Sequence, residues 1–218
     1  MKKRKKIKAI IFDVGGVLQI GKYSSFIPKR EYFGVHQYLS KELGLDIDSW
    51  FDSIDKTYSD SIEGKIDERK SVKVIANNLN INQKKLEKLV IKTYKSFFKK
   101  NKELYSLAYL LKKKGYIVGI LSDQWPLSKK ALISKEDFKL FNPVIISCDV
   151  GFRKPDLKIY KLLFKRLKEK DKKIKMDEIL FVDNRMWNLK PARKLGMKII
   201  LFKDNKQFFR EFKKLEIL

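Results

Sequence analysis

A short apolar run that ends in an aspartate and two glycines most constrains how this chain can fold. Ile7–Phe12 is broken only by one lysine, and Asp13 and the pair Gly15 and Gly16 follow it closely. This pattern is typical of a buried parallel strand and its turn. The basic residues ahead of the run look like the start of a signal peptide. However, the run is too short and no small-residue cleavage site follows, so we expect a buried first strand.

The next part of the chain, from about Tyr23 to Lys100, shows helical spacing and no convincing strand. Its apolar residues recur three and four positions apart, as on one face of an amphipathic helix. This spacing appears in four stretches, which are Tyr38–Leu43, Trp50–Tyr58, Val72–Leu79 and Leu86–Phe98. We therefore predict that residues 22–100 form a separate, all-helical domain.

Beyond this block the pattern changes to strands and helices in alternation. The predicted strands are Tyr116–Leu121, Val144–Ser147, Ile179–Val182 and Lys198–Phe202. The predicted helices are Leu104–Lys114, Pro155–Lys168, Trp187–Leu195 and a last one from Asn205. Such alternation indicates a parallel sheet with helices on both faces. The predicted fold class is thus α/β: a Rossmann-like parallel-sheet core, residues 1–21 and 101–218, with the all-helical domain inserted.

The net charge of +25 raises the question of a nucleic-acid partner. Of the 51 basic residues, eight are arginine and 43 are lysine, spread over nearly every predicted helix. Arginine makes most bidentate contacts to bases and phosphates, and no nucleic-acid-binding motif is present. We expect no specific nucleic-acid partner, although weak binding to polyanions at low salt would follow from such a surface. No apolar stretch approaches the roughly 18 residues that a membrane helix needs, so no membrane partner is expected.

The chain contains one cysteine, Cys148, and one histidine, His36. No intramolecular disulfide can form, which favours a reducing compartment and a cytoplasmic location. We expect Cys148 to be a small buried hydrophobic residue. Zinc clusters and His-based catalytic triads are excluded, so any metal would be a hard ion held by oxygen ligands.

Three polar residues stand at the carboxyl ends of predicted strands: Asp13, Ser122 and Asp183. Ligands of open α/β sheets bind at that edge. A carboxylate beside a tight glycine turn can attack phosphorus and form an aspartyl-phosphate. Two carboxylates share a site with a phosphate dianion only if a cation neutralises them, which implies Mg²⁺. Ser122 could donate to a phosphate oxygen, and Lys154 could supply fixed positive charge.

Four segments of the chain resemble, in order, the four motifs of the haloacid dehalogenase superfamily. They read FDVGGVL at Phe12–Leu18, ILSD at Ile120–Asp123, GFRKPD at Gly151–Asp156 and LFVDN with a later asparagine at Leu180–Asn188. The helical insertion after the first motif resembles the C1 cap of that superfamily. Similar motif sets occur in sugar-phosphatase-like members, in 2-haloacid dehalogenases and in the N-terminal phosphatase domain of epoxide hydrolases. The resemblance implies a Mg²⁺-dependent hydrolase that cleaves a small phosphate ester, such as a sugar phosphate.

The resemblance also implies roles for individual residues. Asp13 would be the nucleophile and a Mg²⁺ ligand, and the backbone carbonyl of Gly15 and the side chain of Asp183 would complete the metal site. Lys154 would hold the nucleophile and the phosphate in place. Ser122 would bind the phosphate.

The chain departs from the family pattern at three positions. Gly15 stands where most phosphatases of the superfamily have the aspartate that acts as general acid and base, although some sugar-phosphatase-like members also have glycine. Asn184 replaces the second acid of the fourth motif, which should weaken metal binding, and it could support the site together with Asn188. Asp123 stands where many relatives carry asparagine and adds an acid beside the substrate phosphate.

These departures leave two other functions open. A member of the family that has lost catalysis could bind a phosphorylated ligand or an acidic partner through its basic surface. A 2-haloacid dehalogenase would use the same Asp13 on carbon without a metal, although the retained Asp183 argues for a metal and hence for phosphate.

Several aromatic residues lie near the motifs or within the helical segment. Trp125 and Trp187 each lie within a few residues of a motif and could line a pocket mouth, but core packing is the prediction for both. The same prediction holds for Tyr23, Phe26 and Trp50 in the helical segment.

Overall fold

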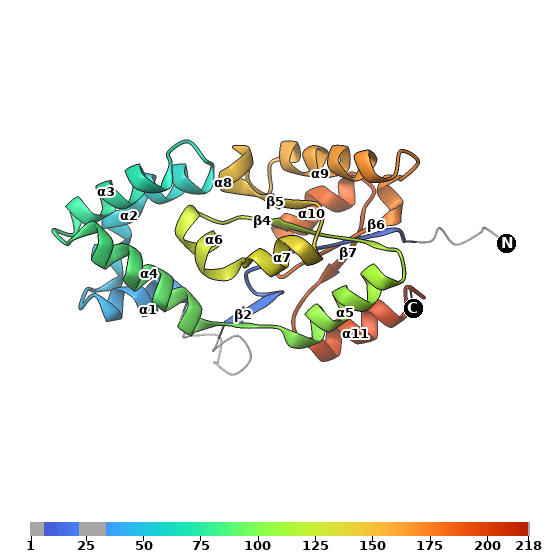
Figure 1. Ribbon diagram of the computed structural model, residues 1–218, viewed down its shortest axis with the longest axis horizontal. Helices are drawn as coiled ribbons and strands as arrows, with labels where there is room; N and C mark the ends of the chain where they lie inside the picture. Colours follow the sequence, from blue (N-terminus) through green and yellow to red (C-terminus); the bar gives the residue numbers. More distant parts are fainter. Residues whose placement is uncertain (1–6, 22–33, 218) are drawn as a thin grey trace.

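The computed structural model describes residues 7–21 and 34–217. Its centre is a five-stranded sheet in the order β5-β4-β1-β6-β7, in which every neighbouring pair is parallel (Figure 1). The strands are β1 (Ala9–Phe12), β4 (Ile117–Ser122), β5 (Val144–Ile146), β6 (Ile179–Asp183) and β7 (Lys198–Leu201). The predicted parallel α/β sheet is therefore confirmed, and the first strand of the chain lies at its middle.

Alternating side chains of β1 point into two separate apolar clusters. Ile10 and Phe12 belong to one cluster, whereas Ala9 and Ile11 belong to the other, and all four are fully buried. This alternation is the two-residue repeat of a strand that is covered on both faces. Helices α5 (Lys102–Lys113) and α11 (Asn205–Lys213) cover the first face, and α9 (Leu157–Lys170) and α10 (Met186–Lys194) cover the second (Figure 1).

Four helices follow the first strands and lie to one side of the sheet in Figure 1. They are α1 (Val35–Glu42), α2 (Ile47–Ile62), α3 (Glu68–Asn78) and α4 (Gln83–Phe97), and we call them the helical block. Side chains of Asp46, Asp67 and Asn82 accept hydrogen bonds from backbone N–H groups at the starts of α2, α3 and α4. Trp50 is fully buried in this block, as predicted. Core packing was also predicted for Tyr23 and Phe26, which lie outside the described residues.

A two-stranded antiparallel ribbon joins the helical block to the sheet. It consists of β2 (Gln19–Gly21) and β3 (Phe98–Lys100), so the prediction that no strand occurs up to Lys100 is wrong at its end. Phe98 continues the helical spacing of α4, and only pairing with a distant segment turns it into a strand. Gly21 pairs with Phe98, so the chain leaves the sheet beside the point where it returns. The division into two domains at residues 22 and 100 stays a prediction.

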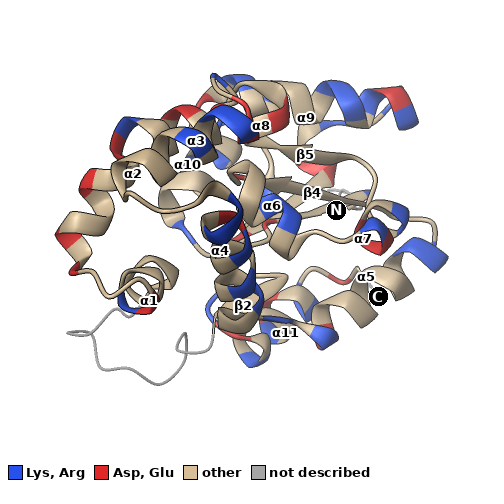
Figure 2. Ribbon diagram, turned by 60° about the vertical axis from the view of Figure 1, so that its left-hand side comes forward, with Lys and Arg blue, Asp and Glu red and all other residues tan. Residues whose placement is uncertain are grey.

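Two short helices, α6 (Pro126–Leu132) and α7 (Lys135–Leu140), connect β4 to β5, and a third, α8 (Ser147–Val150), follows β5. They were not predicted, because each is too short to show a clear period. Helix α6 packs against α4 and so attaches the helical block to the core (Figure 2). Cys148 on α8 packs against the core but is only partly buried, so the prediction of a small buried hydrophobic residue is confirmed only in part. Within residues 7–21 and 34–217, no helix has the length and apolar character to cross a bilayer.

Candidate functional site

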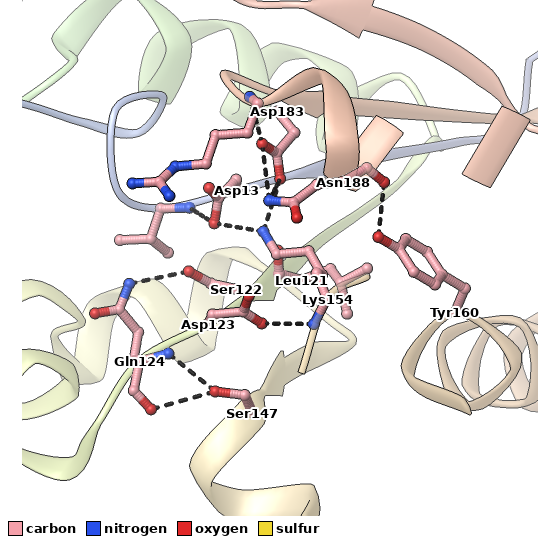
Figure 3. A network of polar contacts seen from close by, with 12 residues as sticks. Asp13, Leu121, Ser122, Asp123, Gln124, Ser147, Lys154, Tyr160, Asp183 and Asn188 are labelled. Carbon is pink, nitrogen blue, oxygen red and sulfur yellow. Dashed lines mark hydrogen bonds and ion pairs between the residues drawn. The ribbon is translucent and has the colours of Figure 1, made fainter. Parts of the chain in front are cut away.

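The carboxyl ends of β1, β4 and β6 meet at one edge of the sheet. Phe12 is in register with Ile120 of β4 and with Val182 of β6, so the residue that follows each of these positions stands at the same level. Asp13 follows β1, and Asp183 is the last residue of β6. Figure 3 shows both carboxylates pointing toward the side chain of Lys154. The predicted convergence of these three side chains is thus present in the structure.

Lys154 links the two carboxylates. Its Nζ lies 3.0 Å from Oδ1 of Asp13 and 2.7 Å from Oδ2 of Asp183, and it also donates to the backbone carbonyl of Leu121 at 3.2 Å. Burial by itself would lower the pKa of Lys154, but the charges of Asp13 and Asp183 outweigh burial and raise that pKa above its usual range. The ammonium group therefore stays charged and is held in a fixed position.

Asp13 combines burial with access to solvent at one side. Its Oδ1 also accepts a hydrogen bond of 2.8 Å from the backbone N–H of Val14, while about a tenth of the side chain is exposed. Burial raises the pKa of Asp13 to about 6, and the nearby Lys154 limits that rise. The carboxylate is therefore ionised at neutral pH and only partly hydrated, which suits a nucleophile.

Asp183 has both of its oxygens occupied by donors. Its Oδ1 accepts from the backbone N–H of Arg185 at 2.8 Å and from Nδ2 of Asn188 at 3.2 Å. Its Oδ2 accepts from Lys154 and, at 3.1 Å, from the same Asn188 amide. The side chain is completely buried. These contacts favour a role in positioning Lys154, and direct ligation of a metal by Asp183 stays a prediction.

Asn188 is itself held by the core. Its backbone carbonyl accepts a hydrogen bond of 2.6 Å from the hydroxyl of Tyr160 on α9. A helix on the second face of the sheet thereby fixes the residue that orients Asp183 (Figure 3). The predicted supporting position of Asn188 agrees with this contact network.

The glycine turn after Asp13 is closed by Asn184. Gly16 has φ +82°, a conformation that other residues rarely adopt, so a side chain there would be strained; its Cβ would also lie 2.2 Å from Nδ2 of Asn184, which would have to move. Gly15 is different, because a Cβ there would have no neighbour nearer than Nε2 of Gln124 at 4.0 Å. The space beside Gly15 is therefore open to a side chain.

The donors at this edge fit a hard cation in kind but carry little charge. Asn184 can offer an amide oxygen, Gly15 a backbone carbonyl and Asp13 a carboxylate. Gly15 and Asp13 line the cavity, as does a second carboxylate, Asp123. In the part of the chain that the structure describes, no group of three or more His, Cys, Asp or Glu side chains could hold a metal ion. Oxygen donors of this kind suit Mg²⁺, but a site with fewer carboxylates binds divalent ions more weakly.

Hydrogen bonds hold the last residue of β4 and the two residues that follow it. The hydroxyl of Ser122, which is fully buried, accepts from Nε2 of Gln124 at 3.0 Å, and the backbone N–H of Gln124 donates to Oγ of Ser147 at 3.0 Å. Asp123 accepts from the backbone N–H of Lys154 at 3.0 Å and lines the cavity. Gln124 was not predicted as a site residue, and only its position next to Ser122 and Asp123 could have indicated it.

A cavity of about 570 Å³ opens above Asp13, Asp123, Lys154 and Asn188. Its walls come from the helical block, from α6 and from the segment after β6. Trp187 lines the rim with 57% of its surface exposed, so the prediction that it packs in the core is wrong. Trp125 is buried, as predicted, and donates to the hydroxyl of Tyr94 at 3.2 Å. The other wall residues were missed, because their spacing indicates only an amphipathic helix.

Replacing Lys154 tests the central ion pairs. We expect Lys154→Met to lower the free energy of unfolding by about 3–5 kcal/mol in metal-free buffer, because it leaves two buried carboxylates without a counter-charge. Chemical denaturation measures this change. The control is Lys161→Met on the exposed side of α9, which should stay within about 0.5 kcal/mol of the wild type. Equal stability of the Lys154→Met variant and the wild type would show that the carboxylates do not depend on Lys154.

Known proteins similar to this chain share its architecture and parts of its sequence. A solved HAD family enzyme from Bacteroides thetaiotaomicron superposes with a TM-score of 0.73 at 20% identity, covering 95% of this chain and 99% of the other. A structure of that enzyme with magnesium and inorganic phosphate superposes with a TM-score of 0.70 at 19% identity, covering 94% and 99%. At these identities the likeness establishes the fold.

Two curated proteins match part of the sequence. Bifunctional epoxide hydrolase 2 of Rattus norvegicus is 35% identical over 120 residues, which are 53% of this chain and 21% of that protein. Glyceraldehyde 3-phosphate phosphatase of Pyrococcus furiosus is 33% identical over 98 residues, 44% of this chain and 39% of that protein. The match thus spans about a fifth of the length of the first relative and two fifths of the second. The family model of haloacid dehalogenase-like hydrolases matches residues 7–196, and the chain belongs to that family of hydrolases.

Proposed function

We propose that this hydrolase is a Mg²⁺-dependent phosphatase that cleaves a small phosphate monoester through an aspartyl-phosphate on Asp13. The observation that carries the proposal is the buried contact of Lys154 with both Asp13 and Asp183 at the sheet edge. A fixed ammonium beside an ionised carboxylate offers both a nucleophile and positive charge for a phosphoryl group. Two relatives support the reaction class, since one is a phosphatase by name and one was solved with magnesium and inorganic phosphate.

In the proposed reaction Lys154 binds the phosphoryl group and keeps Asp13 in line with the phosphorus atom. The Asp13 carboxylate attacks, the bond from phosphorus to the ester oxygen breaks, and the leaving oxygen departs with the electron pair and takes a proton from solvent. Water then attacks the aspartyl-phosphate and releases inorganic phosphate. Ser122 and Asp123 contribute to the phosphate end of the site, and the helical block acts as the cap that covers it.

Mg²⁺, when bound, would neutralise negative charge between the phosphate and Asp13. We assign its ligands to the side chain of Asp13, the backbone carbonyl of Gly15 and the amide oxygen of Asn184. Both oxygens of Asp183 accept hydrogen bonds, and its proposed role is to hold the ammonium group, while its ligation of Mg²⁺ stays a prediction.

The first test compares the wild type with Asp13→Asn. We expect the wild type with Mg²⁺ to release phosphate from p-nitrophenyl phosphate and Asp13→Asn to lose activity by about 10³-fold or more, because an amide is a poor nucleophile. Phosphate release measures this, and beryllofluoride binding by ¹⁹F NMR reports on Asp13 independently of turnover. An inactive wild type that still binds phosphate would favour the non-catalytic alternative. Chloride release from 2-chloropropionate would instead favour the dehalogenase.

A second prediction concerns the charge of the metal site. Asn184→Asp adds a carboxylate where the amide now lies against the glycine turn, and we expect Mg²⁺ to bind about tenfold more tightly. Isothermal titration calorimetry with Mg²⁺ alone measures this affinity. The matched control is Asn77→Asp on the exposed side of α3, which adds the same charge far from the cavity and should leave the affinity unchanged. Similar affinities for Asn184→Asp and the wild type would remove Asn184 from the ligand set.

A third prediction concerns the missing general acid. Because the space beside Gly15 is open, Gly15→Asp should place a carboxylic acid near the leaving group. We expect alkyl phosphates to be hydrolysed about 10²-fold faster, within the usual range of general acid catalysis. Steady-state rates across esters of graded leaving-group pKa measure the effect. Gly15→Asn has the same size without the acid and should not accelerate the reaction, so equal gains in both variants would contradict this explanation.

A further inference from the structure

The wall that the helical block contributes to the cavity is aromatic. Of the described residues that line the cavity from this side, Phe51, Tyr58 and Tyr94 lie on α2 and α4, Phe98 begins β3, and His36 lies on α1. The rest of this wall is aliphatic. The described part of the helical block thus lines the cavity without a carboxylate, an amide or a lysine.

The polar atoms of this wall are already engaged with other side chains. Nε1 of Trp50 donates to Nδ1 of His36 at 3.0 Å, and Nε2 of His36 lies 3.3 Å from the hydroxyl of Tyr58. The hydroxyl of Tyr94 accepts from Trp125. Burial lowers the pKa of His36 to about 4, so its ring is neutral at physiological pH. A polyol needs several matched donors and acceptors, and this wall offers few of them.

Two large aromatic side chains at the rim are exposed to solvent. Phe51 is 45% exposed and Trp187 is 57% exposed, and both line the cavity, from α2 and from α10 respectively. The guanidinium of Arg185 lies 5.1 Å above the Trp187 ring and presents positive charge at the same rim. Exposed aromatic surface beside a charged cavity is typical of a binding site for a flat apolar group.

We propose that the ligands of this site are aryl phosphates, in which the phosphate is joined to an aromatic ring that packs against Phe51 and Trp187. The proposal deepens the phosphatase function above and rests on it for turnover. It also agrees with the glycine at position 15, because a phenolate with a pKa of about 10 leaves without a proton from the enzyme. The bond between phosphorus and the aryl oxygen breaks, the phenolate takes the electron pair, and solvent later supplies its proton.

The test compares 2-naphthyl phosphate with glucose 6-phosphate and AMP. AMP also carries a flat ring, but its leaving group is an alkoxide. It therefore shows whether the site prefers aryl esters or binds any phosphate ester that carries a flat ring. We expect the KM for 2-naphthyl phosphate to be at least about tenfold lower than that for glucose 6-phosphate, and kcat/KM to exceed that for AMP. Comparable or better values for glucose 6-phosphate or AMP would overturn the proposal.

Variants at the rim provide the second part of the test. Phe51→Ala and Trp187→Ala should each raise the KM for 2-naphthyl phosphate about 5- to 10-fold, with little change for glucose 6-phosphate. Phe138→Ala is the matched control, because Phe138 is 49% exposed on α7 and does not line the cavity, and its KM should equal that of the wild type. An unchanged KM in both rim variants would overturn the proposal.

A binding measurement separates this proposal from the proposed catalytic function. Calorimetry with naphthylmethylphosphonate, which cannot be hydrolysed, reports ring recognition in the Asp13→Asn variant without turnover. Binding that depends on Phe51 and Trp187, in a protein that hydrolyses no ester, would support the ligand class and reject the phosphatase. Hydrolysis of phosphate esters without any preference for an aromatic ring would support the proposed phosphatase function and reject the proposal that its ligands are aryl phosphates.

Discussion

The contact of one buried ammonium group with two carboxylates organises this molecule. Lys154 can meet Asp13 and Asp183 only if β1 and β6 are neighbours and the segment before α9 crosses their carboxyl ends. Burying three charges is costly unless each finds its partner, so any shift of these strands would leave an unpaired charge in the interior. The same contact that constrains the fold therefore also sets the position and charge of the proposed nucleophile.

Hydrogen bonds from the core hold this arrangement in place. Tyr160 fixes Asn188, which orients Asp183, and Ser147 fixes Gln124, which reaches Ser122. The site has less negative charge than the usual motifs of its family would provide, since Gly15 and Asn184 replace acids. Lys154 supplies the positive charge that pairs with Asp13 and Asp183, and the aromatic wall of the helical block is the basis of the proposed preference for aryl phosphates.

Much of the fold was predictable, because a strand buried on both faces and an amphipathic helix each leave a local repeat in the sequence. Ile7–Phe12 and Ile179–Val182 were identified in this way, as were the four helices of the block. The ribbon of β2 and β3 was not, because a three-residue strand exists only through its pairing with a distant segment. Helices α6 and α7 were missed because they span too few residues to show a period.

For the site, the sequence by itself determined which residues stand at strand ends, and parallel strands bring their ends together whatever the loops do. Asp13, Ser122 and Asp183 could therefore be named in advance. The tertiary structure decided what they contact: Asp183 accepts hydrogen bonds from Lys154 and Asn188, while Asn184 lies against the glycine turn. It also decided that Trp187 faces the cavity rather than the core. Such contacts depend on side chains that meet only after folding, and spacing along the chain carries no record of them.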